Sequence, residues 1–327
     1  MNSPTALDDW RNEVNALGAA RRPCFVLLDF ELQRPRVWTA DDLSTSGLQF
    51  SFPGRDRMAS RGPAKKIALR AEPLAYGDYL RAFELVQGGL QRGDSFLTNL
   101  TFPVGIQMTA TLADVYHSSD AKYRVLLEPH FVCFSPETFV TIREDGYIES
   151  RPMKGTAADT PAGRAGLLRD AKEIAEHATI VDLIRNDLSR VARGVRVTDY
   201  RYLRAIETAA GGLVQTSSKI GGQLPGDWAG GLGDLLLQLT PAGSVSGAPK
   251  SATLELIRRA EDHPRGYYCG VAGYFDGRTF DSCVLIRFIQ LAEGQHYFHA
   301  GGGITAYSRP EDEYRELLAK VRIPHKL

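Results

Sequence analysis

Predicted strands come in groups along this chain of 327 residues, and helices separate the groups rather than the single strands. Short apolar runs at 123–128, 131–134, 138–143 and 147–151 predict consecutive strands. Asp145-Gly146 supplies a hairpin turn between the last two. Because the chain lacks the strict strand–helix–strand order of a parallel sheet, the sequence favours an α+β fold with mixed or antiparallel sheets.

Apolar residues at helical spacing predict helices around these strands. The predicted helices cover 76–91, 165–190, 229–239, 249–261 and 311–321. Further strands are expected at 24–30, 65–69, 96–102, 195–207, 267–275, 280–290 and 295–300. The glycine run Gly301, Gly302 and Gly303 follows the last strand, and it lets the backbone approach a ligand or another strand closely.

The charge balance argues against a nucleic acid or an anionic membrane surface as the main partner, because 39 basic and 39 acidic residues give a formal net charge of +0. No apolar run reaches transmembrane length, and the first residues are acidic where a signal peptide needs a basic region. Cys24, Cys133, Cys269 and Cys283 show no metal-binding spacing and are expected to be reduced. We therefore expect a cytoplasmic protein.

Lys154 stands in the hexapeptide RPMKGT (151–156), directly after a predicted strand. Pro152 removes a backbone donor and fixes φ, and Gly155 permits conformations that are closed to other residues. The pattern predicts a strand that ends in a stiff turn and presents one amine. Such a lysine is a nucleophile if its neighbours lower its pKa, whereas the simpler interpretation is a solvated lysine on a turn.

Two predicted helices carry the same pair of carboxylates. Glu173 and Glu176 lie three residues apart on one helix, and Glu313 and Glu316 on another, so each pair shares a helix face beside an apolar stripe. Two such pairs at the edge of one core would need a cation, and carboxylate oxygens with a few waters suit Mg²⁺. The simpler interpretation is that each pair is a solvated helix face.

The loop TPAGSVSGAPKS (240–251) is rich in glycine and serine and opens into a predicted helix, whose free amides can bind an anion. Its spacing differs from the GxxxxGK[ST] of a nucleotide-binding loop, and the segment before it is predicted to be helical. A carboxylate ligand therefore fits better than a nucleotide. Arg287 lies among apolar neighbours and must be paired or face a polar pocket, and Tyr267 begins the preceding predicted strand.

Taken together, these segments resemble the chorismate-utilising enzymes, a family that includes anthranilate, aminodeoxychorismate, isochorismate and salicylate synthases. The matching stretches follow the family's order between about Gly93 and Lys320, and they are SPETF, RPMKGT, DAKEIAEHATIVDLIRNDLSRV, PAGSVSGAPKSA, GYYCGVAGYFD and AGGGITAYSRPEDEYRELLAK. The resemblance implies one large domain with a β-sandwich core flanked by helices. Within it, a strand-rich portion at 1–75 would be integrated with a catalytic chorismate-binding portion at 76–327.

The resemblance also implies a magnesium-dependent site for chorismate. Glu176 and Glu316 would ligate the metal, with Glu173 and Glu313 contributing directly or through water. The residues that would bind the substrate are Thr156, Ser244, Tyr267, Arg287, Gly302, Gly303 and Lys320. An arginine and backbone amides are sensible choices for a dicarboxylate, because they offer directed donors in a shielded site.

Lys154 distinguishes members of the family. Anthranilate synthases resemble one another in having alanine at this position, whereas aminodeoxychorismate synthases have P-x-K-G-T. In the latter, the lysine is taken to attack C2 of chorismate and expel the C4 hydroxyl, after which ammonia adds at C4. Glu137 of SPETF would be the acid–base group. The resemblance therefore implies formation of 4-amino-4-deoxychorismate for p-aminobenzoate and folate synthesis.

Two positions depart from the family pattern. Leu97 stands where isochorismate and salicylate synthases resemble one another in having a water-activating lysine, so water addition at C2 is disfavoured; it also differs from the glutamine common in aminodeoxychorismate synthases. Gln215 stands where many relatives have a histidine, and an amide cannot carry a proton. No Leu-Leu-Glu-Ser-like segment of the tryptophan-binding kind is found, so tryptophan feedback is not expected.

The resemblance implies that ammonia comes from a glutamine amidotransferase on a separate chain, because no amidotransferase domain is evident here. No lyase domain is evident either, so release of p-aminobenzoate is not expected. Two other interpretations remain open, namely an anthranilate synthase or a member with another product, and a non-catalytic relative. The identity of the ring product separates the first from amination, and Mg²⁺-dependent turnover of chorismate separates the second.

Overall fold

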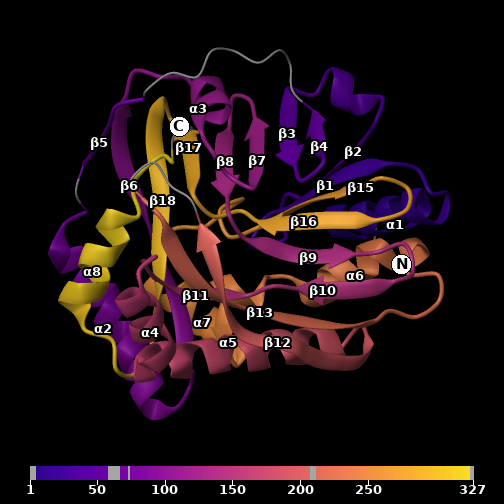
Figure 1. Cartoon of the computed structure of the whole chain (residues 1–327). Helices are drawn as coiled ribbons and strands as arrows, with labels where there is room; N and C mark the ends of the chain where they lie inside the picture. The colour runs from indigo at the N-terminus through magenta and orange to yellow at the C-terminus, as the bar shows by residue number, and fades with distance from the viewer. Residues whose placement is uncertain (1–4, 58–66, 73, 207–210, 325–327) are drawn as a thin grey trace.

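Two antiparallel sheets form the centre of the molecule in the computed structural model, which describes residues 5–57, 67–72, 74–206 and 211–324 (Figure 1). Sheet A runs β11 (Met153–Ala158), β13 (Leu213–Gln223), β10 (Tyr147–Ser150), β9 (Thr138–Ile142), β16 (Phe280–Val284), β15 (Val271–Phe275), β1 (Cys24–Leu28) and β2 (Arg36–Thr39), and β12 (Arg193–Ile206) pairs with β13. Sheet B runs β14 (Gly247–Ala248), β6 (Leu97–Met108), β18 (Gln295–Ile304), β17 (Phe288–Ala292), β8 (Phe131–Ser135), β7 (Tyr123–Leu127), β3 (Leu48–Phe52) and β4 (Arg55–Arg57), and β5 (Leu69–Ala71) pairs with β6.

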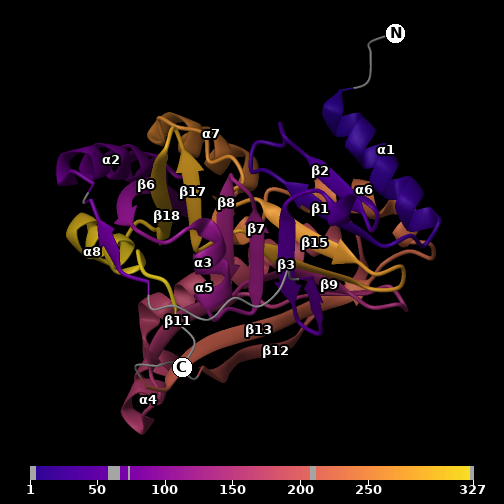
Figure 2. The ribbon, with the colours of Figure 1, turned by 90° about the horizontal axis from the view of Figure 1, so that it is seen from above.

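Helices cover the outside of this pair of sheets. They are α1 (Ala6–Ala19), α2 (Tyr76–Arg92), α3 (Leu112–Ser118), α4 (Pro161–Arg169), α5 (Ala171–Ser189), α6 (Leu232–Leu239), α7 (Lys250–Ala260) and α8 (Pro310–Ala319), with short 3₁₀ turns η1 (Asp42–Ser44), η2 (Ala229–Gly231) and η3 (Gly243–Val245). Figures 1 and 2 place α2 and α8 beside β6 and β18 at one end of the molecule, and α1 and α6 at the other. α5 runs against β12 and β13 and contacts η3.

The hydrophobic core has two parts, because successive side chains along a strand of sheet B point into different clusters. Tyr123, Val125 and Leu127 of β7 belong to the cluster that sheet B shares with sheet A, whereas Leu126 belongs to the cluster under α2, α3 and α8. Successive side chains of a strand point to opposite faces, so sheet B is buried on both sides. The prediction of an α+β protein with antiparallel sheets flanked by helices is confirmed.

The predicted single helix over 165–190 is two helices. Asp170 is both the C-cap of α4 and the N-cap of α5, and its side chain accepts a hydrogen bond from the Glu173 N–H at 3.0 Å. A capping aspartate takes an extended backbone conformation, here φ −63° and ψ 118°, and this ends one helix before the next begins. The predicted strand at 65–69 begins outside the described residues, and β5 covers Leu69–Ala71.

The predicted strand over 280–290 is also two elements, and they belong to different sheets. β16 ends at Val284 in sheet A and β17 starts at Phe288 in sheet B, so the chain crosses between the sheets in the three residues that separate them. Arg287, with a φ of 56°, lies in this crossover rather than within a strand. No helix of the described residues is long and apolar enough to cross a membrane.

Candidate functional site

A cavity lies beside the crossover between β16 and β17, and residues of both sheets and of the end of α8 line it. The lining includes Asn99, Glu137, Lys154, Ser244, Tyr268, Arg287, His299, Gly301, Gly302, Gly303 and Lys320. The cavity leaves about 180 Å³ for the centre of a water-sized molecule. One water needs roughly 10–15 Å³ on this measure, so the cavity has room for a small organic ligand.

β11 presents Lys154 to this cavity at a β-bulge. Its pairing with β13 shifts register directly after Lys154, where Gly155 has a φ of 68°. The Lys154 Nζ lies 3.5 Å from Oε2 of Glu176. A Cβ atom on Gly303 would lie 3.1 Å from this Nζ and 3.0 Å from Cδ1 of Leu97. The glycine run of β18 and the apolar Leu97 therefore enclose the amine closely.

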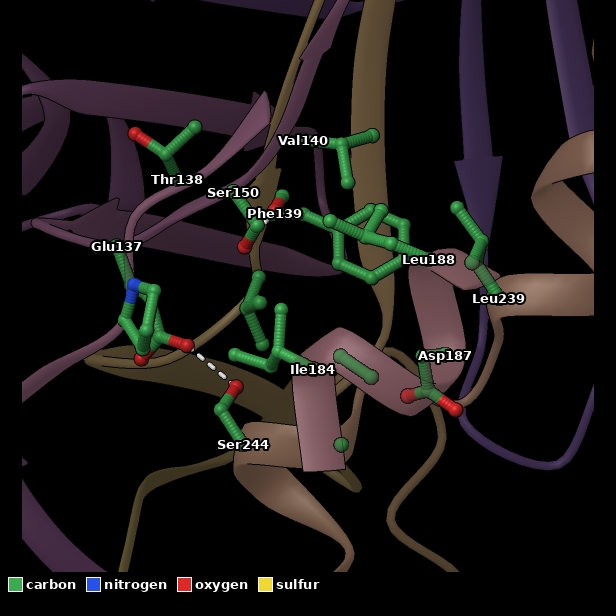
Figure 3. A pocket seen from close by; sticks show the side chains of 14 residues that line it. Glu137, Thr138, Phe139, Val140, Ser150, Ile184, Asp187, Leu188, Leu239 and Ser244 are labelled. Carbon is green, nitrogen blue, oxygen red and sulfur yellow. Dashed lines mark hydrogen bonds between the residues drawn. The ribbon is translucent and has the colours of Figure 1, made fainter. Parts of the chain in front are cut away.

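Glu137 occupies the turn between β8 and β9. Its N–H donates a hydrogen bond to Oγ of Ser135 at 3.1 Å, and the hydroxyl of Ser244 in η3 donates to its carboxylate (Figure 3). Burial raises the pKa of Glu137 above its ordinary value, although the hydrogen bond from Ser244 and the charge of Lys154 act in the opposite direction. A raised pKa favours the protonated carboxyl, which is the form that can donate a proton to a leaving group.

Lys172 of α5 lies beside one glutamate of each pair, Glu176 of α5 and Glu313 of α8. The Lys172 Nζ lies 3.8 Å from Oε1 of Glu176 and 3.4 Å from Oε1 of Glu313, so one ammonium joins the two helices. The Lys320 Nζ lies 2.8 Å from Oε1 of Glu316. The side chain of Lys172 is 49% exposed, so it can leave the carboxylates for solvent without unfolding either helix.

These carboxylates fit a hard divalent cation by their chemistry. Burial and the neighbouring Glu176 raise the pKa of Glu173; burial also acts to raise that of Glu316, but nearby lysines, Lys320 foremost, lower it below its ordinary value. Within the described ranges no three His, Cys, Asp or Glu side chains are already gathered as metal ligands. Lys172 supplies the positive charge between the helices instead, and carboxylate oxygens are the type of ligand that Mg²⁺ prefers.

A comparison with known proteins identifies the family to which the chain belongs. The sequence matches the chorismate binding enzyme family over residues 33–326. The chain belongs to the chorismate binding enzyme family. The predicted resemblance is thus confirmed.

Several chorismate-binding enzymes and relatives are similar to this one. An uncharacterised PabA-like protein of Haemophilus influenzae is 44% identical over 313 residues, which cover 95% of each chain. Aminodeoxychorismate synthase component 1 of Salmonella typhimurium is 34% identical over 289 residues, which cover 83% of this chain and 62% of its own. The menaquinone-specific isochorismate synthase of Escherichia coli has a TM-score of 0.73 at 18% identity, covering 98% of this chain and 82% of its own, and so shares the fold.

The cavity of this chorismate-binding enzyme also carries groups suited to an anion. Arg287 donates a hydrogen bond from Nη1 to the Lys320 carbonyl at 2.7 Å, and the Lys320 Nζ donates to the Gly301 carbonyl at 2.8 Å. Burial, with the charge of Arg322, lowers the pKa of Arg287 below its ordinary value. A guanidinium that is desolvated in this way is stabilised by an anionic partner, such as a ligand carboxylate.

Two predicted substrate-binding residues lie elsewhere in the chorismate-binding enzyme. Tyr267 does not line the cavity, because its hydroxyl donates to the Arg34 carbonyl at 2.8 Å and its ring packs on Phe131. Thr156 is exposed beyond the bulge and accepts a hydrogen bond from Nε2 of Gln215 at 3.4 Å. The bulge in β11 places Thr156, and the turn before β15 places Tyr267. A periodic pattern of apolar residues predicts neither the bulge nor the turn.

Three polar side chains of the lining are not among the predicted site residues, namely Asn99, Tyr268 and His299. Tyr268 directly follows the predicted Tyr267, and its ring centroid lies 5.0 Å from that of His299. Burial lowers the pKa of His299 to about 3, so its imidazole is neutral and shares a 2.9 Å hydrogen bond with Gln290. Asn99 pairs with Gly303 across β6 and β18. Its position in the cavity therefore follows from the register of these two strands, which the sequence alone does not give.

Proposed function

We propose that this enzyme aminates chorismate at C4, with Lys154 as the nucleophile and Glu137 as the acid–base group. The observation that carries the proposal is the position of Lys154, whose amine lies in the cavity against Gly303 while Glu137 lines the same cavity. The similarity to an aminodeoxychorismate synthase component 1 supports it. Leu97 beside the amine offers no group that could activate water, which favours ammonia as the incoming nucleophile.

The proposed reaction has two steps whose atoms balance. In the first, the neutral Lys154 amine bonds to C2 of chorismate, both ring double bonds shift by one position, and the C4–O bond breaks as Glu137 protonates the hydroxyl, which leaves as water. In the second, ammonia bonds to C4, both double bonds shift back, and the C2–N bond to Lys154 breaks. The new C4 ammonium gives one proton to Glu137, so both side chains regain their starting states.

Chorismate is held, in this proposal, by the cationic wall of the cavity. Arg287 and Lys320 would bind its carboxylates, together with backbone amides at Gly302 and Gly303. Glu176 and Glu316 would ligate Mg²⁺ with Glu173 and Glu313 beside them, after Lys172 has turned to solvent. The metal would supply a fixed positive charge that neutralises the ring carboxylate of the substrate.

A glutamine amidotransferase on another chain is the proposed source of ammonia, as the family resemblance implies. A second candidate function is anthranilate synthesis, since anthranilate synthase component 1 of Bacillus subtilis is 32% identical over 272 residues. The two reactions give different ring products from the same substrate. Product identity therefore decides between them.

The test combines product analysis with a search for the covalent adduct. Purified protein with chorismate, Mg²⁺ and ammonium should form a product in which NH₂ replaces OH. Without ammonium, intact-protein mass spectrometry should find protein plus chorismate less water in the wild type but not in Lys154→Ala. Lys219→Ala is the matched control, because that lysine pairs with Asp199 at 2.7 Å away from the cavity. Anthranilate as the product, or full activity of Lys154→Ala, would refute the proposal.

A further inference from the structure

Three consecutive residues of β13, Thr216, Ser217 and Ser218, carry hydroxyl groups inside the molecule, at 1%, 2% and 0% exposure. None of the three lines the cavity. A buried hydroxyl costs stability unless it is hydrogen-bonded, so an internal strand keeps three in a row only where each has a partner. The partners of these hydroxyls lie in the two segments that carry Lys154 and Glu176.

Two of the hydroxyls hold the segment of Lys154. The Thr216 hydroxyl donates to the Lys154 carbonyl, and the Ser217 hydroxyl donates to the Pro152 carbonyl at 3.0 Å. The Ser218 N–H donates to the same Pro152 carbonyl at 3.1 Å. Because the pairing of β11 with β13 shifts register directly after Lys154, these bonds fix β11 where its regular ladder is interrupted.

The third hydroxyl reaches α5. Oγ of Ser218 lies 2.7 Å from Nε2 of His177, a fully buried residue that directly follows Glu176. The same oxygen accepts a hydrogen bond from the Arg201 N–H of β12 at 2.9 Å. Since that oxygen already accepts from Arg201, its own hydrogen is available to His177. Ser218 therefore fixes α5 to β13 next to the glutamate.

One strand thus holds both members of the Lys154–Glu176 ion pair. Lys154 pairs directly with Thr216 across β11 and β13, so both side chains point to one face of the sheet, and Ser218, two residues on, shares it. α5 packs on β11 and β13. The Lys154 Nζ lies 3.5 Å from Oε2 of Glu176 between these two anchored segments.

We propose that Thr216 and Ser218 are positioning residues, which hold Lys154 of β11 and Glu176 of α5 in contact and so place the amine for its attack on C2. The inference rests on the proposed amination. Neither side chain touches the substrate, because Thr216 acts through the Lys154 carbonyl and Ser218 through His177. A misplaced amine lowers the rate of the chemical step and leaves the groups that bind chorismate in place.

The first test compares kcat with KM. Thr216→Val replaces the hydroxyl by a methyl group, Thr216→Ser keeps it, and Ser218→Ala removes the bond to His177. The matched control is Thr179→Val on α5, whose hydroxyl also donates to a backbone carbonyl, that of Ala175 at 2.9 Å, and which does not line the cavity. Rates are measured with chorismate, Mg²⁺ and ammonium, and circular dichroism checks folding.

Thr216→Val and Ser218→Ala should lower kcat by about tenfold or more while the KM for chorismate changes by less than about twofold. Thr216→Ser should restore most of the rate, and Thr179→Val should keep the rate of the wild type. An unchanged kcat in folded Thr216→Val and Ser218→Ala would overturn the proposal. Equal losses in Thr216→Val and Thr179→Val would overturn it as well.

The second test measures the contact itself and needs no chorismate. A water-soluble carbodiimide joins an amine to a carboxylate that touches it, and the water lost in forming the amide converts the carbodiimide to its urea. Peptide mapping should find the Lys154–Glu176 amide in the wild type and in Thr179→Val. Thr216→Val and Ser218→Ala should lose most of it. The Lys172–Glu176 link is the internal standard, because it joins two residues of α5 and should not fall.

The two tests separate this inference from the proposed function. If the wild type forms the Lys154–Glu176 amide and the two variants lose it, but no variant aminates chorismate, the amination fails and the positioning of Lys154 stands. If the wild type aminates chorismate and the variants keep both the amide and the wild-type kcat, the amination stands and the positioning fails.

Discussion

At the scale of single residues, Ser244 lowers the pKa of Glu137. Its hydroxyl donates to the carboxylate, and this donation stabilises the ionised form against the effect of burial. Ser244→Ala removes the donor, so the carboxylate becomes less stable and the pKa of Glu137 rises further. Because Glu137 must be protonated to release water, activity is lost as pH rises through this pKa. The alkaline limb of the kcat profile that belongs to Glu137 should therefore move to higher pH.

Ser246→Ala is the control for this shift. Ser246 lies in the same loop, but its hydroxyl donates to the Ala242 carbonyl at 3.0 Å and reaches no carboxylate. Its pH profile should keep the shape of the wild type even if its stability falls. A Ser244→Ala profile that moves to lower pH, or not at all, would show that the serine does not tune Glu137.

Gly155 directly follows Lys154 in the chain and lies against the carboxylate of Glu173. It has a φ of 68°, and an added Cβ would lie 2.5 Å from Oε2 of Glu173. Gly155→Ala should displace that carboxylate and raise the Mg²⁺ concentration needed for half-maximal activity by about tenfold. Gly194→Ala is the matched control, because Gly194 has a φ of 61° with no atom near its Cβ position. Both changes strain the backbone, and only the first should alter the Mg²⁺ dependence. Equal Mg²⁺ curves for the two variants would contradict the proposed metal site.

Residues held by a local motif could be placed from the sequence, whereas residues placed by long-range geometry could not. Glu137 lines the cavity from a turn that its own neighbours form, whereas Lys154 lines it from β11, at the bulge that Gly155 permits, and not from the predicted turn. The resemblance implies Tyr267 as a substrate-binding residue, but the turn before β15 places Tyr268 in the cavity lining instead. Lys172 lies between Glu176 and Glu313 because α5 and α8, which are far apart in the chain, come close in the fold. The spacing of residues within either helix does not predict this contact.

At the scale of elements, one buried ion pair joins the segments that carry the cavity wall. Arg265 donates to Glu261 at 2.6 and 2.8 Å, to the Val245 carbonyl at 2.7 Å and to the Asn99 carbonyl at 2.6 Å. Glu261 in turn accepts from the Thr101 N–H at 2.8 Å. The pair is 1% and 2% exposed. It therefore ties the end of α7 to η3 and β6 through groups that water does not screen.

Arg265→Met should lower the free energy of unfolding by about 3–5 kcal/mol, because it leaves Glu261 charged, buried and unpaired. Adding Glu261→Gln should recover part of this loss, since the amide carries no charge. Urea unfolding of the wild type, both single variants and the double variant gives the coupling energy directly. Additive losses in this cycle would mean that the two side chains act independently. Lost activity in folded Arg265→Met would further show that the pair positions the wall.

At the scale of the whole molecule, α1 belongs to the same core as the catalytic sheets. It packs on α6 and η2, and Trp10 donates from Nε1 to the Arg36 carbonyl at 2.9 Å. Trp10, Val14 and Leu17 share one hydrophobic cluster with β1, β16 and α5. The first 75 residues are therefore expected to unfold together with the rest of the chain and not as a separate unit.

Gly18 offers a test of that cooperativity. A Cβ added there would lie 1.8 Å from the Ala229 carbonyl oxygen in η2, so Gly18→Ala must push α1 away from its neighbour. The variant should lose about 1–3 kcal/mol of stability in a single transition that all probes report together. Gly166→Ala is the control, because its Cβ meets nothing within 4 Å and alanine should stabilise α4 by about 0.5–1 kcal/mol. Thermal unfolding followed by both tryptophan fluorescence and far-ultraviolet circular dichroism makes the comparison. Two separate transitions in Gly18→Ala, with the catalytic activity surviving the first, would show that the N-terminal portion folds independently of the core.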